Sequence, residues 1–169
     1  MTTHVAVFWT IAAAVVAWAL AECCRLAGAQ LHLARAVWTV GAAAMVIHAA
    51  AAFAILYEGS QAVALAAVAR QTAAIAGVST GAGLYVNYAF IAIWIADAAW
   101  WWTVPAAKAA VAGTWAWARF AFFLFMIVNG AVVFADGWMR GLGLGAVIAI
   151  LSTLLWTRRR GRVITPRMV

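Results

Sequence analysis

Long stretches without a charged residue dominate this sequence and decide its fold class. The first, residues 5–21, is apolar almost throughout, and comparable stretches recur along the rest of the chain. About 20 apolar residues are enough to cross a bilayer as a helix. Of the 169 residues, 69% are hydrophobic and 9% are charged, which leaves no room for a separate water-soluble domain. The sequence therefore predicts an all-α integral membrane protein whose main partner is the lipid bilayer.

Polar and glycine-rich breaks between the apolar runs predict a bundle of about five membrane-spanning helices and one shorter helix. Residues 61–76 are alanine-rich, but Arg70 lies near their centre and costs roughly 2.5–3.5 kcal/mol in a membrane-crossing helix. We therefore expect a short interfacial helix there, between spans two and three. The expected spans are residues 5–27, 34–57, 83–103, 114–136 and 138–157, followed by a basic cytoplasmic tail, residues 158–169.

The distribution of cations predicts the orientation of this bundle. Five spans place eight cations on one side and only Arg70 and Arg140 on the other. Because Lys and Arg are in excess on the cytoplasmic side, we expect a cytoplasmic (inner) membrane protein with its N-terminus outside and its C-terminus in the cytoplasm. Cations that follow a span directly favour anionic lipid headgroups over nucleic acid as their partner. The eight are Arg25, Arg35, Lys108, Arg158, Arg159, Arg160, Arg162 and Arg167.

Polar residues inside the third and fourth spans predict how these two helices pair. Asp97 lies about six residues from the cytoplasmic end of one span, and Arg119 lies equally far from that end of the next. The same antiparallel register brings Asn87 level with Asn129. An unpaired charge in hydrocarbon is costly, so we expect an Asp97–Arg119 ion pair and a second clasp between the two asparagines. The register also places Trp94 near Phe122, Phe90 near Met126 and Trp101 near Trp115.

A functional interpretation of the same residues stays open. Glu22 lies at a similar depth in the first span, and with Asp97 and Arg119 it would form a proton- or ion-responsive site. Because a matched partner explains the buried carboxylate of Asp97, we favour the structural interpretation.

His48 is a separate candidate, near the middle of the second span and one turn after Met45. Its imidazole could form a hydrogen bond with a neighbouring helix, ligate a metal or haem b, or relay protons. We favour the hydrogen bond. His4 and His32 lie near the membrane surfaces, so Met126 is the remaining candidate for a second haem ligand.

The other conspicuous residue types have structural explanations. Tryptophans near span ends are typical of interfacial belts, although an aromatic platform for a quinone is an alternative. Trp38 and Trp94 lie deeper, where we expect packing. The adjacent Cys23 and Cys24 predict two buried thiols rather than a disulfide or a metal site. The expected belt residues are Trp100, Trp101, Trp102, Trp115, Trp117, Trp138 and Trp156.

Two glycines in the fifth span, Gly141 and Gly145, have the spacing that lets two membrane helices approach closely. This spacing is compatible with a homo-oligomer, although it is common in membrane helices by chance.

Function follows less directly than fold. The sequence contains no motif typical of hydrolysis or nucleotide use, so we lean against an enzyme. We favour a non-catalytic accessory or structural subunit of a membrane complex. One alternative is a small ion or solute transporter that uses Asp97, Arg119 and Glu22. Another is a redox subunit centred on His48 that binds haem or a quinone.

Overall fold

The structure, a computed structural model, describes residues 2–28, 31–103 and 114–160. All regular elements in these ranges are helical, which confirms the predicted all-α architecture for this part of the chain. The loop with Pro105 and Lys108, residues 161–169 of the tail, and the side chains of His4 and Trp115 lie outside what is described. The elements are α1 (Thr2–Leu26), α2 (Leu31–Ile55), α3 (Gln61–Ala76), α4 (Gly83–Thr103), α6 (Thr114–Val128), the π-helix η1 (Asn129–Val133) and α7 (Gly137–Arg159).

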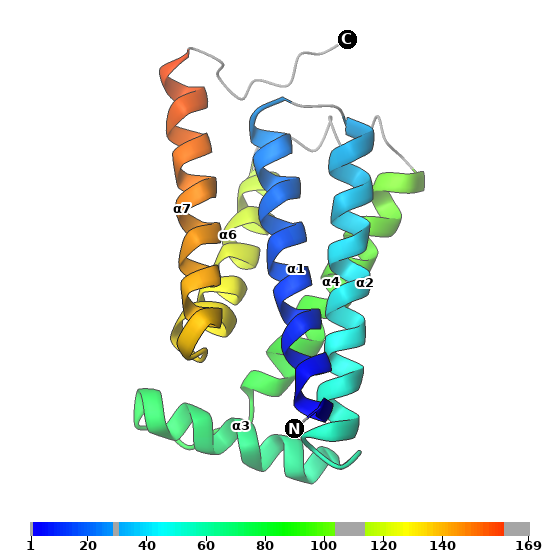
Figure 1. Ribbon diagram of the computed structural model, residues 1–169, viewed down its shortest axis with the longest axis vertical. Helices are drawn as coiled ribbons and strands as arrows, with labels where there is room; N and C mark the ends of the chain where they lie inside the picture. Colours follow the sequence, from blue (N-terminus) through cyan, green and yellow to red (C-terminus); the bar gives the residue numbers. More distant parts are fainter. Residues whose placement is uncertain (1, 29–30, 104–113, 161–169) are drawn as a thin grey trace.

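Helix α1 is the central element, with α2 on one side and α7 on the other (Figure 1). Its small residues permit close packing: Ala14 and Ala17 are buried, and Gly41 of α2 lies opposite. A Cβ atom at Gly41 would lie 2.7 Å from Cζ2 of Trp94 and 3.2 Å from Cβ of Ala17. Glycine at this position therefore makes room for a tryptophan ring where α1, α2 and α4 meet.

Four of the described helices are long and apolar enough to cross a membrane: 5–26, 32–55, 116–133 and 137–159. Helix α4 has 21 residues and contains Asn87 and Asp97, and it is not one of these four. A fifth span along α4 stays a prediction. Helix α2 starts at Leu31, three residues before the predicted span, so His32 lies in the helix and not in the preceding link.

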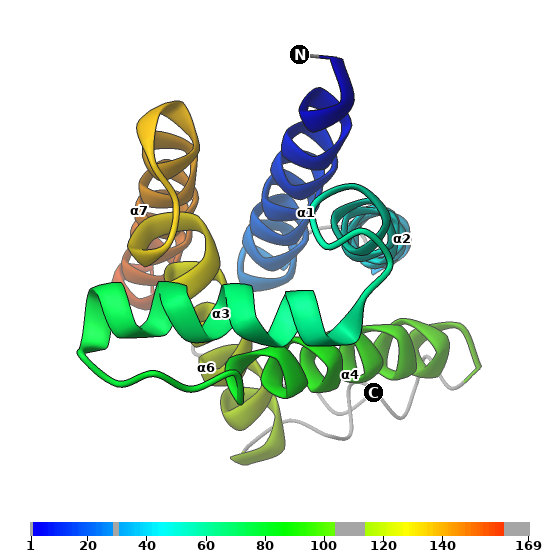
Figure 2. The same ribbon diagram turned by 90° about the horizontal axis from the view of Figure 1, so that it is seen from below.

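Helices α3 and α4 lie at a large angle to the other helices. Figure 2 shows both lengthwise, whereas α2 is seen nearly along its axis. Helix α3 coincides with the predicted helix 61–76 and crosses the end of the bundle where α2 ends (Figure 1). Its Ala64 and Val68 are buried with Leu84 of α4, while Arg70 is exposed. Its place at a membrane interface stays a prediction.

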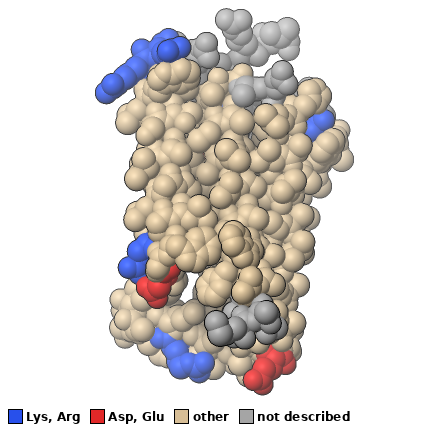
Figure 3. Space-filling view, in the orientation of Figure 1, with Lys and Arg blue, Asp and Glu red and all other residues tan. Residues whose placement is uncertain are grey.

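Apart from the buried Arg119, the described cations lie at the two ends of the bundle. Helix α1 ends, α2 begins and α7 ends at the same end, which we call the basic end; it carries Arg25, Arg35 and Arg158–Arg160. Arg70 and Arg140 lie at the opposite end. Between the ends, the visible face is a broad band without Lys, Arg, Asp or Glu (Figure 3). Such a band suits the hydrocarbon layer of a bilayer.

At the start of α7, Gly143 makes a close approach within the chain, whereas Gly141 and Gly145 do not. Both outer glycines are exposed, and a Cβ atom on either would meet no other atom within 4 Å. A Cβ atom at Gly143 would overlap the carbonyl oxygen of Ala131 in η1 and would lie 2.8 Å from the carbonyl carbon. Gly141 and Gly145 therefore make no close contact within the described part of the chain, and their role in a homo-oligomer stays a prediction.

Candidate functional site

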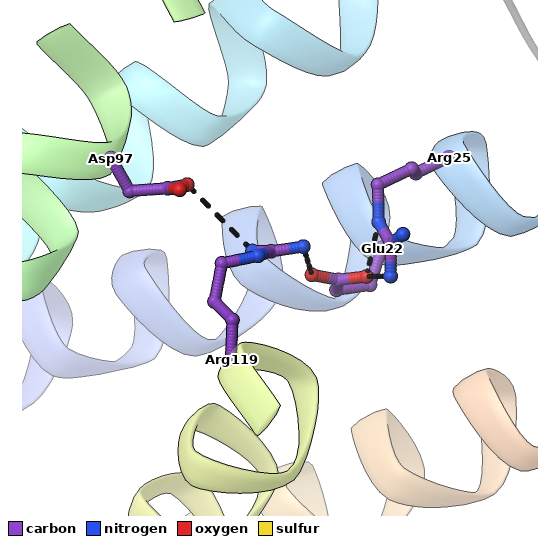
Figure 4. Close-up of polar contacts among 4 residues, drawn as sticks. All are labelled: Glu22, Arg25, Asp97 and Arg119. Atoms are coloured by element: carbon purple, nitrogen blue, oxygen red, sulfur yellow. Dashed lines mark hydrogen bonds and ion pairs between the residues drawn. The ribbon is translucent and has the colours of Figure 1, made fainter. Parts of the chain in front are cut away.

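A network of four charged side chains lies inside the bundle, toward the basic end (Figure 4). It joins Glu22 and Arg25 of α1, Asp97 of α4 and Arg119 of α6. Two carboxylates and two guanidinium groups balance in formal charge. Three helices that are far apart in the sequence therefore share one set of ionic contacts.

Glu22 is the most deeply buried member, with 1% of the residue exposed. Its two carboxylate oxygens have different partners: Oε2 accepts from Nε of Arg25 at 2.8 Å, and Oε1 lies 3.1 Å from Nη2 of Arg119. A buried carboxylate needs such partners because transfer of its charge out of water is costly. Glu22 thus links a neighbour on its own helix to a residue of α6.

Arg119 is the junction of the network, and its side chain is 5% exposed. Its Nη2 faces Glu22, while Nη1 lies 3.7 Å from Oδ2 of Asp97. The guanidinium carbon also lies 4.8 Å from the ring centroid of Trp38. An aromatic face attracts a cation, and the planar guanidinium can serve two carboxylates at once. The guanidinium of Arg119 therefore contacts three other helices: α1 through Glu22, α4 through Asp97 and α2 through Trp38.

The structure brings Asp97 and Arg119 together but not as an isolated pair. Sequence reasoning placed Glu22 at the right depth and treated Arg25 only as a topology signal. The missed signal was local: Glu22 and Arg25 are three residues apart and share one face of α1. A carboxylate and an arginine at this spacing inside an apolar run indicate a charge pair that a single helix carries into the membrane.

The second expected clasp is not formed as predicted. Nδ2 of Asn129 donates to the carbonyl oxygen of Phe125, four residues earlier on its own helix, and Asn87 is exposed. The strong tilt of α4 explains this, because crossed helices meet over a short length and not along a full antiparallel register (Figure 2).

Aromatic contacts mark the point where α4 crosses α6. Phe123 lies 4.9 Å from Phe90 and 5.3 Å from Trp94, measured between ring centroids. The expected partner of Trp94 was Phe122, so the ring in contact is one residue further along α6. Phe90 packs on Phe122 and Phe123 where Met126 was expected. The register was close at the crossing point and fails away from it.

The described tryptophans for which a position was predicted lie in the core or at the surface as predicted, except for Trp101. Trp38 and Trp94 are buried, as the packing interpretation requires. Trp101, an expected belt residue, is also buried and stacks on Trp38 at 5.9 Å. Its neighbours Trp100 and Trp102 are about half exposed. Three consecutive tryptophans on a helix point in three directions, so one of them faces the core.

A further contact at the basic end joins α2 to α4. The indole Nε1 of Trp102 donates to Oγ1 of Thr39 at 2.9 Å, and the guanidinium of Arg35 lies 3.8 Å from the Trp102 ring centroid. Arg35 and Thr39 are four residues apart, so both reach the same side of α2. Sequence reasoning treated Arg35 only as a topology signal and did not anticipate this clasp.

His48 connects α2 to α1. Its Nδ1 lies 3.0 Å from the carbonyl oxygen of Val7. Because a carbonyl oxygen only accepts, Nδ1 carries the proton, and in the neutral ring Nε2 is the acceptor. The contact is the interhelical hydrogen bond favoured from the sequence. The same tautomer occurs in histidines that ligate a metal through Nε2, so the redox alternative needs a direct test.

Replacement of His48 by alanine is expected to lower the free energy of unfolding by about 0.5–1.5 kcal/mol, since one interhelical hydrogen bond is lost. Asparagine is the matched control, because its amide nitrogen can donate from nearly the same position, and it should retain most of the stability. Unfolding in a denaturing detergent series gives the comparison. An absorption spectrum of the same samples tests haem: a Soret band that vanishes in His48→Ala would reverse the structural assignment.

The chain matches no known protein family, and comparisons with curated proteins and with solved structures found no significant match. The functional argument therefore depends on the arrangement of the charged network and on the helices that it joins.

Proposed function

We propose that this chain is a non-catalytic structural or accessory subunit of a membrane complex, with α4 as a fifth span. The observation that carries the proposal is the use of Arg119. Its guanidinium contacts carboxylates of α1 and α4 while its own backbone belongs to α6. Buried charges that neutralise one another across three helices hold a fixed arrangement, which is what a subunit needs to present a constant surface to a partner.

The structure of the residues outside the charged network supports the same proposal. Nearly all described residues belong to helices, and the segment between α2 and α4 is itself mostly helix α3. The exposed surface includes large apolar side chains on α1, α2, α4 and α7. Lipid and a neighbouring membrane protein can both cover such a surface. A chain built almost wholly of membrane-embedded surface acts most simply through other molecules in the membrane.

The test is a purification from native membranes at native expression level, in a polymer that retains the surrounding lipid. We expect a second integral membrane protein to co-purify at a fixed ratio, and its abundance to fall when this chain is deleted. The triple neutral variant Glu22→Gln, Asp97→Asn, Arg119→Met is the matched control, since it keeps the outer surface. Recovery of the chain alone, with no change in any other membrane protein on deletion, would contradict the proposal.

A small transporter is the second candidate, favoured because Glu22, Asp97 and Arg119 converge in one buried site. Ion flux into vesicles that contain the purified chain separates the two candidates. Transport is favoured if the purified chain gives flux and the triple neutral variant, although folded, does not. The subunit is favoured if the purified chain gives no more flux than empty vesicles.

A further inference from the structure

A groove opens on the outside of the bundle between the last two turns of α1 and the last two turns of α7. It has a volume of about 620 Å³ and is lined by Cys23, Cys24, Ala27, Ser152, Thr153 and Trp156. Small side chains on the α1 side leave the space, and the Trp156 ring forms the wall nearest the basic end. The helices touch deeper in, where Oγ1 of Thr153 lies 3.4 Å from Sγ of Cys23. The groove is therefore apolar along most of its walls, with two hydroxyl groups on one side.

The exposed charges around this groove on α1 and α7 are all positive. The guanidinium of Arg160 lies 4.2 Å from the ring centroid of Trp156, which places a cation at the rim. Arg158 and Arg159 are exposed at the same helix end (Figure 3). Helix α7 contains no acid, and the one acid of α1, Glu22, is buried and bound by two arginines. An anion at the rim would thus meet cations without an exposed carboxylate beside them on either helix.

The dimensions suit a molecule with a charged head and an apolar body. Ser152 lies eight residues before Arg160, about 12 Å along the helix. A phosphate at the level of the terminal arginines would leave the glycerol region against Cys24, Ala27 and Trp156. The start of an acyl chain would then lie at the level of Cys23, Ser152 and Thr153. Tryptophan at the rim is the residue type that favours the headgroup level of a bilayer.

From this charge complementarity and shape, we propose that the groove between α1 and α7 is a binding site for a glycerophospholipid with an anionic headgroup. The arginines at the end of α7 hold the phosphate, and the groove holds the glycerol region and the start of one acyl chain. Basic sites between membrane helices hold anionic lipids by this combination of charge and fit. The site is independent of the partner proposed above.

The test is native mass spectrometry of the full chain in detergent, titrated with phosphatidylglycerol or phosphatidylcholine of the same acyl composition. We expect the anionic lipid to bind more tightly. Arg160→Gln should weaken phosphatidylglycerol binding about fivefold, the effect of one arginine at a membrane surface. Arg70→Gln, an exposed arginine at the opposite end, is the matched control and should change it less than about twofold.

A second pair of variants separates a groove from diffuse attraction to a basic end. Ser152→Phe fills the groove and should weaken phosphatidylglycerol binding at least about tenfold. Leu151→Phe adds the same ring at the adjacent exposed position outside the groove and should leave binding unchanged. Circular dichroism confirms that each variant is folded, and Ser152→Leu replaces Ser152→Phe where it is not. Equal binding of both lipids, or full binding when the groove is filled, would overturn the proposal.

Discussion

Replacement of Arg119 by methionine is expected to lower the free energy of unfolding by about 3–5 kcal/mol, because it leaves two carboxylates inside the bundle without their shared cation. Glu22 retains Arg25 on its own helix, but its Oε1 loses the contact at 3.1 Å, and Asp97 loses the contact at 3.7 Å. Methionine keeps a long apolar side chain against Trp38, so the change removes charge more than packing. Unfolding in a denaturing detergent series, followed by tryptophan fluorescence, measures the loss.

The control for this variant removes the remaining charges as well. With Glu22→Gln and Asp97→Asn added, no uncompensated carboxylate is left, and we expect stability to return to within about 2 kcal/mol of the original protein. The network would lose its structural role in our account if the single and triple variants were equally stable.

A charge swap distinguishes a shared arginine from a simple pair. The double variant Asp97→Arg, Arg119→Asp would fully restore an ion pair that stood alone. Here it would also place a carboxylate beside Glu22, where the guanidinium of Arg119 now lies. We therefore expect the swapped variant to recover less stability than the triple neutral variant. Full recovery on the swap would show that the contact with Glu22 contributes little.

The second large effect is expected at Gly143. An alanine there would bring Cβ into overlap with the carbonyl oxygen of Ala131 and within 2.8 Å of the carbonyl carbon. Backbone atoms cannot rotate away as a flexible side chain can, so α7 and η1 would have to separate. We expect a loss of about 1–3 kcal/mol from overpacking.

Gly141→Ala is the matched control, since the same methyl group meets nothing within 4 Å. Alanine favours a helix over glycine by up to about 1 kcal/mol, so this variant should be neutral or slightly more stable. The unfolding assay used for Arg119 applies to both glycine variants. Equal effects at the two positions would contradict the close approach of α7 to η1.

The sequence predicted those features of the structure that depend only on how deep a residue lies in the membrane. The apolar runs predicted an all-helical bundle, and the polar breaks predicted α3 at residues 61–76. Because Asp97 and Arg119 lie at the same depth, the sequence also predicted that they are partners. It could not reveal the tilt of α4, which is set by how aromatic rings such as Trp94 and Phe123 fit together. For that reason the clasp between Asn87 and Asn129 was expected where the helices in fact diverge.

One other error originates in rotation about a helix axis. Trp101 was expected at the surface and is buried. Rotation also decides that Gly143, between Gly141 and Gly145, makes the close contact of α7 with η1. Spacing shows which residues share a face, but not which face meets another helix. The contact of Arg25 with Glu22 was missed for a different reason. Arg25 already had an explanation as a cation that sets membrane topology, and the spacing of three residues between it and Glu22 was not considered.

The unequal distribution of charge partners has a consequence for how the protein enters the membrane during synthesis. Helix α1 brings Glu22 and Arg25 together, already paired within one turn. Asp97 and Arg119 are the only charged residues of α4 and α6, so neither helix can neutralise its own charge. We expect α1 and α2 to be released into lipid first, and α4 and α6 to remain at the insertion machinery until Asp97 and Arg119 can meet.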